Sequence, residues 1–322
     1  MSQAFTPPFY LKNAFVQTLL ASNKLGTRRN NPMLNAAREV LLKPIPNVTL
    51  QGFYSPHPQA KAVVMLLHGW EGSVNSAYVL RTGIFLYEHG YSVFRLNYRD
   101  HGDTHHLNTG LFYAILLDEV FASVQAVAGY ETSKPFYLVG FSMGGNFALR
   151  VARKCAAQPI PNLKHIFSIS PVLDPEKSTV AIDQHPTLQK YFRQGWSRSL
   201  LKKQNLYPHL YHFDEGFKSD TLMAMTEWML QHYSEYPVMR DYFRQYSLLN
   251  DALTALNVPT TIITAQDDPI IPVADFYDLK LSPTTELIIH SHGGHNGFFE
   301  TLSGRAWYQK KIMDTFTSLS PN

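Results

Sequence analysis

Short apolar runs recur along the chain and alternate with stretches in which apolar residues follow a helical period. The first clear run covers residues 62–67 and ends at a His-Gly pair. Such a run is typical of a strand that a parallel sheet buries on both faces. We therefore expect strands separated by helices. The expected strands cover residues 62–67, 91–98, 135–139, 163–170, 260–264 and 286–290, and the expected helices cover 76–89, 113–128, 146–153 and 305–319.

The alternation predicts an α/β fold with a mostly parallel sheet and helices on both faces. Residues 174–257 interrupt it, because they contain four prolines and many aromatic residues but no strand pattern. We expect this segment to be a mainly helical insertion between two core strands. It would cover the carboxyl ends of the strands, where ligands bind in open α/β sheets. The predicted division is a core of residues 1–173 and 258–322 with a helical cap of residues 174–257.

The N-terminal region predicts smaller elements. Residues 9–20 carry apolar residues at helical spacing, which favours a helix that packs on the main domain. Weak association with a membrane surface is the alternative for this helix. Residues 30–46 are polar and are expected to be partly extended. Residues 48–54 contain two short apolar pieces around Gln51, which predict a short hairpin.

Composition limits the class of protein. The chain has 322 residues, 16% of them charged, and a formal net charge of +3 with dispersed Lys and Arg, which favours a solvated surface over nucleic-acid binding. Cys155 is the only cysteine, so an internal disulfide is excluded. Residues 1–8 lack the pattern of a secretory signal, and no apolar run reaches the ~18 residues of a membrane span. We expect a cytoplasmic protein.

A Gly-x-Ser-x-Gly pattern at residues 140–144 marks the candidate nucleophile, Ser142. It follows a short β-forming run and precedes a helical pattern, which is the context of a nucleophile elbow. The glycines would let the tight turn pass its neighbours while Ser142 stands above the sheet. The alternative interpretation is a glycine-rich strand-to-helix turn without chemistry.

A serine hydroxyl needs a base, and the base needs an orienting acid. Asp267 and Asp268 directly follow an expected strand, and we favour Asp268 because Pro269 and Pro272 follow it in a loop. Among the later histidines we favour His295, which lies after two glycines. His292 is the second choice, and His290 belongs to an expected strand, so it is interpreted as structural.

An oxyanion hole requires two backbone donors. Met143, directly after Ser142, would supply one. The second is expected from the loop at residues 68–72, and we select the N–H of Trp70, whose indole could also line an acyl site. His68 is interpreted as a residue that braces this loop.

Residues 100–106 combine Asp and His, which are suitable metal ligands. They lack helical or strand spacing, so a polar loop that lines the site is the favoured interpretation. We expect neither a metal nor a cofactor.

These motifs together resemble the α/β-hydrolase superfamily, and most closely its YheT-type branch. The resemblance rests on residues 9–19, 67–73, 140–146, 267–269 and 293–298 and spans nearly the whole chain. It implies Ser142 as nucleophile, His295 as base, the Asp267/Asp268 pair as the acid position, and activity on esters of modest acyl length. The chain departs from the branch at residues 97–102, where the usual Asn-x-Arg-Gly is absent. That departure concerns substrate choice.

The expected function is therefore hydrolysis of carboxylic esters, with short to medium acyl chains, through an acyl-enzyme on Ser142. Acyl transfer or thioester cleavage on the same triad is the alternative, and a non-catalytic ligand-binding protein is a further one. The expected partner is a small-molecule ester with an apolar acyl group, and the oligomeric state stays open. The aromatic residues of the cap predict either an apolar pocket roof or the cap's own core; they are Tyr191, Phe192, Trp196, Trp228, Tyr233, Tyr242 and Phe243.

Overall fold

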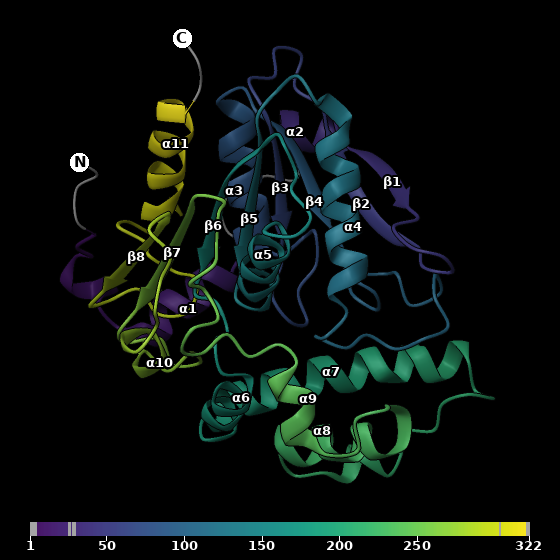
Figure 1. Cartoon of the computed structure of the whole chain (residues 1–322). Helices are drawn as coiled ribbons and strands as arrows, with labels where there is room; N and C mark the ends of the chain where they lie inside the picture. Colours follow the sequence, from purple (N-terminus) through teal and green to yellow (C-terminus); the bar gives the residue numbers. More distant parts are fainter. Residues whose placement is uncertain (1–4, 25–26, 28–29, 303, 320–322) are drawn as a thin grey trace.

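A computed structural model describes residues 5–24, 27, 30–302 and 304–319. In these residues the chain folds around an eight-stranded sheet with the order β1-β2-β4-β3-β5-β6-β7-β8 (Figure 1). Residues 1–4, half of the stretch in which the sequence shows no secretory signal, lie outside the described part. The strands are β1 (Arg38–Leu42), β2 (Leu50–Ser55), β3 (Val63–Leu67), β4 (Ser92–Leu96), β5 (Phe136–Phe141), β6 (Leu163–Ile169), β7 (Thr260–Ala265) and β8 (Thr285–His290).

The six strands from β3 to β8 pair in parallel, and β1 and β2 add an antiparallel edge beside β4. The expectation of a mostly parallel sheet is confirmed. The expected hairpin inside residues 48–54 is wrong, because β2 is one strand and its hairpin partner is β1. The prediction took Gly52 as part of a turn, but this residue lies in the middle of β2. A Cβ there would lie 2.2 Å from Cζ of Phe94. A glycine inside a strand marks such a close approach as often as a turn.

Helices cover both faces of the sheet (Figure 1). Alternate residues of β3 point to opposite faces, as the period of a strand requires. Val63, Met65 and Leu67 belong to one apolar cluster with helices α4 (Leu117–Ala128) and α5 (Met143–Lys154). Val64 and Leu66 belong to another with helices α3 (Ala77–Glu88) and α11 (Trp307–Leu319). The described helices are η1 (Phe9–Leu11), α1 (Ala14–Ser22), α2 (Pro32–Asn35), α3 (Ala77–Glu88), α4 (Leu117–Ala128), η2 (Gly129–Glu131), α5 (Met143–Lys154), α6 (Pro175–Asp183), α7 (Pro186–Leu206), η3 (Gly216–Lys218), α8 (Leu222–Tyr233), α9 (Met239–Arg244), α10 (Ala274–Tyr277) and α11 (Trp307–Leu319).

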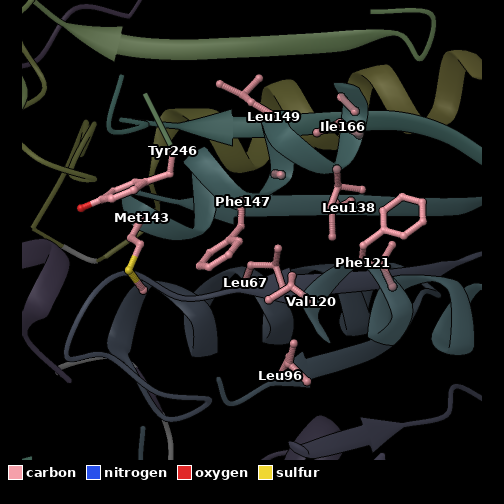
Figure 2. Close-up of a cluster of buried hydrophobic side chains, with 14 of the residues drawn as sticks. Leu67, Leu96, Val120, Phe121, Leu138, Met143, Phe147, Leu149, Ile166 and Tyr246 are labelled. Atoms are coloured by element: carbon pink, nitrogen blue, oxygen red, sulfur yellow. The ribbon is translucent and has the colours of Figure 1, made fainter. Parts of the chain in front are cut away.

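The first cluster joins the sheet to α4 and α5. Figure 2 shows Phe147 of α5 beside Leu67 of β3, with Val120 and Phe121 of α4 closing the same layer. Leu67 and Phe147 are completely buried. This packing fixes α5 against the sheet, and α5 is the helix that follows Ser142.

Between β6 and β7 the chain forms α6, α7, η3, α8 and α9, and these residues contain no strand of the sheet. In Figure 1 the four α-helices lie together beyond one end of the sheet. The segment is therefore helical, as its sequence indicates. Within the described residues, none of the helices has both the length and the apolar character needed to cross a bilayer.

Helix α1 forms where the sequence predicts it, but polar residues make up much of its buried face. Its apolar residues Phe15 and Leu19 are 40% and 67% exposed, whereas the polar residues Gln17 and Thr18 are buried. The reason lies in the loop before α11, whose backbone offers hydrogen bonds that only polar side chains can make. Apolar periodicity therefore identified a helix that packs on the main domain, and part of its apolar face does meet the core, but it did not predict that Gln17 and Thr18 are buried.

Candidate active site

Ser142 lies between β5 and α5 in a strained backbone conformation, with φ 55° and ψ −119°. Positive φ is rare for residues other than glycine and is typical of functional turns. The Ser142 N–H donates to the carbonyl of Ile169 at 2.8 Å, which holds the turn against β6. The predicted strand–turn–helix context is present.

The two glycines of the motif lie where a side chain has no room. A Cβ at Gly140 would lie 2.1 Å from the carbonyl oxygen of Gly144, and a Cβ at Gly144 would lie 2.4 Å from that of Leu67. Both obstacles are backbone atoms, which cannot turn away as a side chain could. The turn therefore requires glycine on both sides of Ser142.

Gly144→Ala should accordingly destabilise the fold by about 3 kcal/mol, because the added methyl group forces β3 and α5 apart. Gly129→Ala is the matched control, since a Cβ at Gly129 meets nothing within 4 Å. Urea unfolding should show Gly129→Ala at wild-type stability or up to about 1 kcal/mol above it. Equal stabilities for the two variants would contradict the steric account.

A cavity of about 140 Å³ opens beside Ser142 under the cap. The loop after β3 contributes Trp70, and the elbow contributes Ser142 and Met143. Most of the surrounding side chains are apolar, and many of them come from the cap. The cap residues that line the cavity include Ile182, Phe192, Trp196, Leu200, Met229, Leu230, Tyr242, Phe243 and Tyr246.

The aromatic residues of the cap divide between the two expected roles. Phe192, Trp196, Tyr242 and Phe243 line the cavity. Trp228 and Tyr233 instead pack around the buried Phe213, inside the cap itself, and Tyr191 is 57% exposed.

The loop after β3 presents Trp70 to the cavity. Tyr78 Oη accepts the N–H of Gly69 at 3.0 Å, which fixes the loop one residue earlier. Among the described residues, the N–H groups of Trp70 and Met143 have no acceptor, and the first N–H of a helix has none within the helix. The indole of Trp70 stacks on Phe192 with ring centroids 5.4 Å apart. The positions predicted for an oxyanion hole thus carry two unoccupied backbone donors at the cavity.

His68 braces this loop as a neutral side chain. Its Nδ1 lies 2.7 Å from the carbonyl of Gly69, and its Nε2 accepts the N–H of Tyr98 at 3.4 Å. Burial, followed by the neighbouring His101, holds the pKa of His68 well below its usual value.

His295 pairs with Asp268. Its Nδ1 lies 2.9 Å from Oδ2 and 3.2 Å from Oδ1 of that carboxylate, whose side chain is completely buried. Asp268 Oδ1 also accepts the N–H groups of Ile270 and Ile271 at 2.9 and 3.0 Å, which pins the carboxylate to its own loop. This arrangement fixes which nitrogen of His295 faces the acid.

Asp267 serves the same loop differently. Its Oδ1 accepts the N–H of Gly294 at 2.9 Å, and its Oδ2 lies 3.4 Å from Nδ1 of His292. His290 contacts Phe5, Phe298 and Trp307 through its ring. The geometry therefore separates the two aspartates: Asp268 faces His295, and Asp267 holds the backbone beside it.

Ser142 and the His295–Asp268 pair lie at the same edge of the sheet. The N–H of Asn296, next to His295, donates to Ser170 Oγ at 3.2 Å, and Ser170 directly follows the residue that accepts the Ser142 N–H. No hydrogen bond joins Ser142 Oγ to His295 Nε2 in the described part of the chain. Such bonds are often long until a substrate is bound. The proton transfer between these two atoms stays a prediction.

The polar loop at residues 99–112 lies against the cap. Asp100 forms a buried ion pair with Lys203 of α7 at 2.7 Å. Lys203 Nζ also donates to the carbonyls of His105 and Asn108, at 3.2 and 2.6 Å. The sequence did not reveal this pair, because 103 residues separate its partners. Across the described residues, no group of three or more His, Cys, Asp or Glu side chains could hold a metal ion.

Glu71 is a second residue that sequence reasoning passed over. It lies in the cavity lining with φ 54°, beside Gly195 of α7. Burial raises its pKa to about 8, against smaller opposite effects of Arg198 and Lys202. The cavity therefore contains a carboxyl that is largely protonated at neutral pH.

This pKa predicts a pH-dependent stability. The unfolded chain releases the Glu71 proton near pH 4.5, whereas the folded chain keeps it to about pH 8. Wild-type stability should therefore fall as pH rises between these values, and Glu71→Gln should not share that loss. We expect the Tm of Glu71→Gln relative to wild type to rise by at least roughly 3 °C from pH 5 to pH 9. Glu215→Gln, at an exposed site, is the control; a constant gap for Glu71→Gln would contradict the prediction.

Comparison with known proteins identifies the family and the fold. The sequence model of the family described as alpha/beta hydrolase fold matches residues 62–302. A Synechocystis protein is 27% identical over 91% of this chain and 87% of its own length. Its name describes it provisionally as an esterase. The Escherichia coli protein YheT, also named provisionally as an esterase, is 24% identical over 81% of this chain and 78% of its own length.

Solved structures show the same fold at lower identity. The Pyrococcus furiosus esterase Pf2001 superposes with a TM-score of 0.56 at 15% identity, covering 88% of this chain and 93% of that one. The 2,6-dihydroxy-pseudo-oxynicotine hydrolase gives a TM-score of 0.58 at 16% identity, covering 95% and 72%. Since the family model covers most of the chain and the sheet and elbow agree with it, the chain belongs to the alpha/beta hydrolase fold family.

Proposed function

We propose that this protein is a serine hydrolase that cleaves carboxylic esters through an acyl-enzyme on Ser142. His295 Nε2 takes the proton from Ser142 Oγ as this oxygen attacks the ester carbonyl. The N–H groups of Met143 and Trp70 stabilise the resulting oxyanion. Asp268 holds Nδ1 of His295 and stabilises the imidazolium.

The remaining steps release the alcohol and then hydrolyse the acyl-enzyme. Collapse of the tetrahedral intermediate breaks the bond to the alcohol, which leaves with the proton from His295. A water molecule then attacks the acyl carbonyl and gives its proton to His295. The carboxylic acid departs, and Ser142 Oγ recovers the proton. No further reactant is required.

The cavity supports the proposed substrate class. Its apolar lining under the cap suits an acyl chain of short to medium length. Ser142 is one of the residues that line the cavity. Relatives named as esterases support ester cleavage. Product analysis with added alcohols and thiols would separate hydrolysis from acyl transfer.

The observation that carries the proposal is a strained serine at an apolar cavity, at the same sheet edge as a buried His–Asp pair. The test is labelling with a fluorophosphonate, which reacts with activated serines. We expect one label per chain, located on Ser142 by peptide mass spectrometry and prevented by competing ester. A folded protein that stays unlabelled, or is labelled elsewhere, would refute the proposal.

A further inference from the structure

Helix α1 packs directly on the loop that carries His295. This loop, residues 293–299, follows β8, whereas α1 comes from the other end of the chain. A Cβ at Gly294 would lie 2.4 Å from the carbonyl oxygen of Ala14, and a Cβ at Gly297 would lie 2.8 Å from Cβ of Gln17. The two backbones therefore touch at glycines, which brings α1 within hydrogen-bonding reach of the loop.

Three consecutive amides of the loop each donate to a side chain from a different part of the molecule. Gly294 donates to Asp267, and Asn296 donates to Ser170. Between them, the N–H of His295 donates to Thr18 Oγ1 at 2.9 Å, across 277 residues of sequence. Thr18 thus holds the backbone of the residue whose ring must meet Ser142.

The hydroxyl of Thr18 is oriented for this purpose. It donates its own proton to the carbonyl of Ala14 at 2.8 Å, one turn earlier in α1. A lone pair then remains for the N–H of His295. Both residues are buried, so water does not readily replace this acceptor.

Gln17 holds the far end of the loop. Its Oε1 accepts the N–H of Phe299 at 2.8 Å, and its Nε2 donates to the carbonyl of Phe299 at 3.1 Å and to that of Leu11 at 2.8 Å. The side chain is completely buried. Its amide bonds to both the N–H and the carbonyl of Phe299, as the backbone of a neighbouring strand would. Thr18 and Gln17 of one helix thus hold the loop at two points, His295 and Phe299.

Helix α1 is itself anchored at both ends. Asn13 Oδ1 accepts the N–H groups of Phe15 and Val16 at its start. At its end, the guanidinium of Arg81 on α3 donates to the carbonyls of Leu20, Ala21 and Asn23. The same guanidinium lies 5.2 Å from the ring centroid of Phe299. The helix can therefore transmit the rigidity of α3 to the loop.

We propose that Thr18, with Gln17, is a positioning residue that sets the orientation of His295 for proton transfer from Ser142. The inference rests on the proposed function. Helix α1 lies outside residues 62–302, which the family model matches, so the site would be completed by a segment beyond that core. Neither residue lines the cavity beside Ser142. Asp268 fixes one nitrogen of the ring, and Thr18 fixes the backbone from which the ring extends.

The decisive variants remove or keep the hydroxyl of Thr18. Thr18→Val preserves shape but removes the acceptor, and Thr18→Ser preserves the acceptor. We expect Thr18→Val to lower kcat for a p-nitrophenyl ester by about 10- to 100-fold with KM nearly unchanged, because a small misplacement of a catalytic group has effects of this size. Thr18→Ser should restore kcat to within about threefold of wild type. The rate of fluorophosphonate labelling should fall and recover in parallel.

A matched control separates positioning from general stability. Thr315 of α11 also donates to the carbonyl four residues earlier, Lys311, at 2.9 Å, but it does not contact the His295 loop. Thr315→Val should therefore keep wild-type kcat. All rates are compared at about 20 °C below the Tm of each variant. If Thr18→Val is too unstable, Thr18→Ala also removes the acceptor while raising helix propensity.

The outcomes distinguish the inference from the proposed function. Wild-type kcat in folded Thr18→Val or Thr18→Ala, with activity abolished in Ser142→Ala, would overturn the positioning role alone. Equal loss in Thr18→Ser and Thr18→Val would also overturn it, since the hydroxyl would then be irrelevant. Full activity in Ser142→Ala would instead remove the proposed function on which the inference rests.

Discussion

Ser142→Ala is expected to lower kcat/KM for a short-chain p-nitrophenyl ester by about four to six orders of magnitude. The variant loses the only oxygen that the proposal allows to attack the ester. The oxyanion donors, Trp70 and Met143, remain in place, so a small residual rate over water should survive. Steady-state kinetics measure the loss, and circular dichroism establishes that the variant is folded.

Ser123→Ala provides the control for Ser142→Ala. Ser123 is a buried serine of α4 whose hydroxyl donates to the carbonyl of Glu119 at 2.7 Å, and it does not line the cavity. Its replacement should leave kcat/KM within about twofold of wild type. If Ser142→Ala keeps more than a tenth of the wild-type kcat/KM, the proposed acyl-enzyme on Ser142 is wrong.

Asp268→Asn is expected to lower kcat by about three to four orders of magnitude while the fold stays intact. The carboxylate accepts a hydrogen bond from the Nδ1–H of His295, whereas an amide can present its own N–H there. The imidazole would then carry its proton on Nε2 and could not accept one from Ser142. The measurement is kcat for the same ester over a range of pH.

Asp267→Asn is the matched control, one residue earlier in the same loop. Asp267 accepts the N–H of Gly294 and does not face His295, so its replacement should lower kcat by less than about tenfold. The effect should appear mainly as a lower Tm, because the loop loses one anchor. The opposite ranking of the two variants would assign the acid role to Asp267.

Local sequence was enough to predict the parallel part of the sheet and the elbow, but not the antiparallel edge that β1 and β2 form. A continuous apolar run such as residues 62–67 is typical of a strand that is buried on both faces, and β3 is such a central strand. The glycines around Ser142 were equally informative, because only glycine fits where backbone atoms approach so closely. Chain order after the strands led us to Asp268 and His295, whose side chains are in contact at 2.9 Å; their catalytic roles stay a prediction.

Local sequence failed where a polar side chain is buried by a distant partner. Gln17 and Thr18 lie on the face of α1 that a hydrophobic pattern assigns to solvent, and Lys203 belongs to a helix that is mostly polar. Burial of such a group is favourable only if hydrogen-bond partners or opposite charges are present at the buried position.

The sequence by itself determined the strand–helix alternation, the strained serine turn and the order of the candidate triad, because each depends on residues close together in the chain. The tertiary structure alone decided which face of α1 is buried, that Asp100 pairs with Lys203, and that Thr18 meets His295. The physical reason is that the free energy of burying a polar group depends on its partner in space, and a local pattern contains no information on a partner 277 residues away.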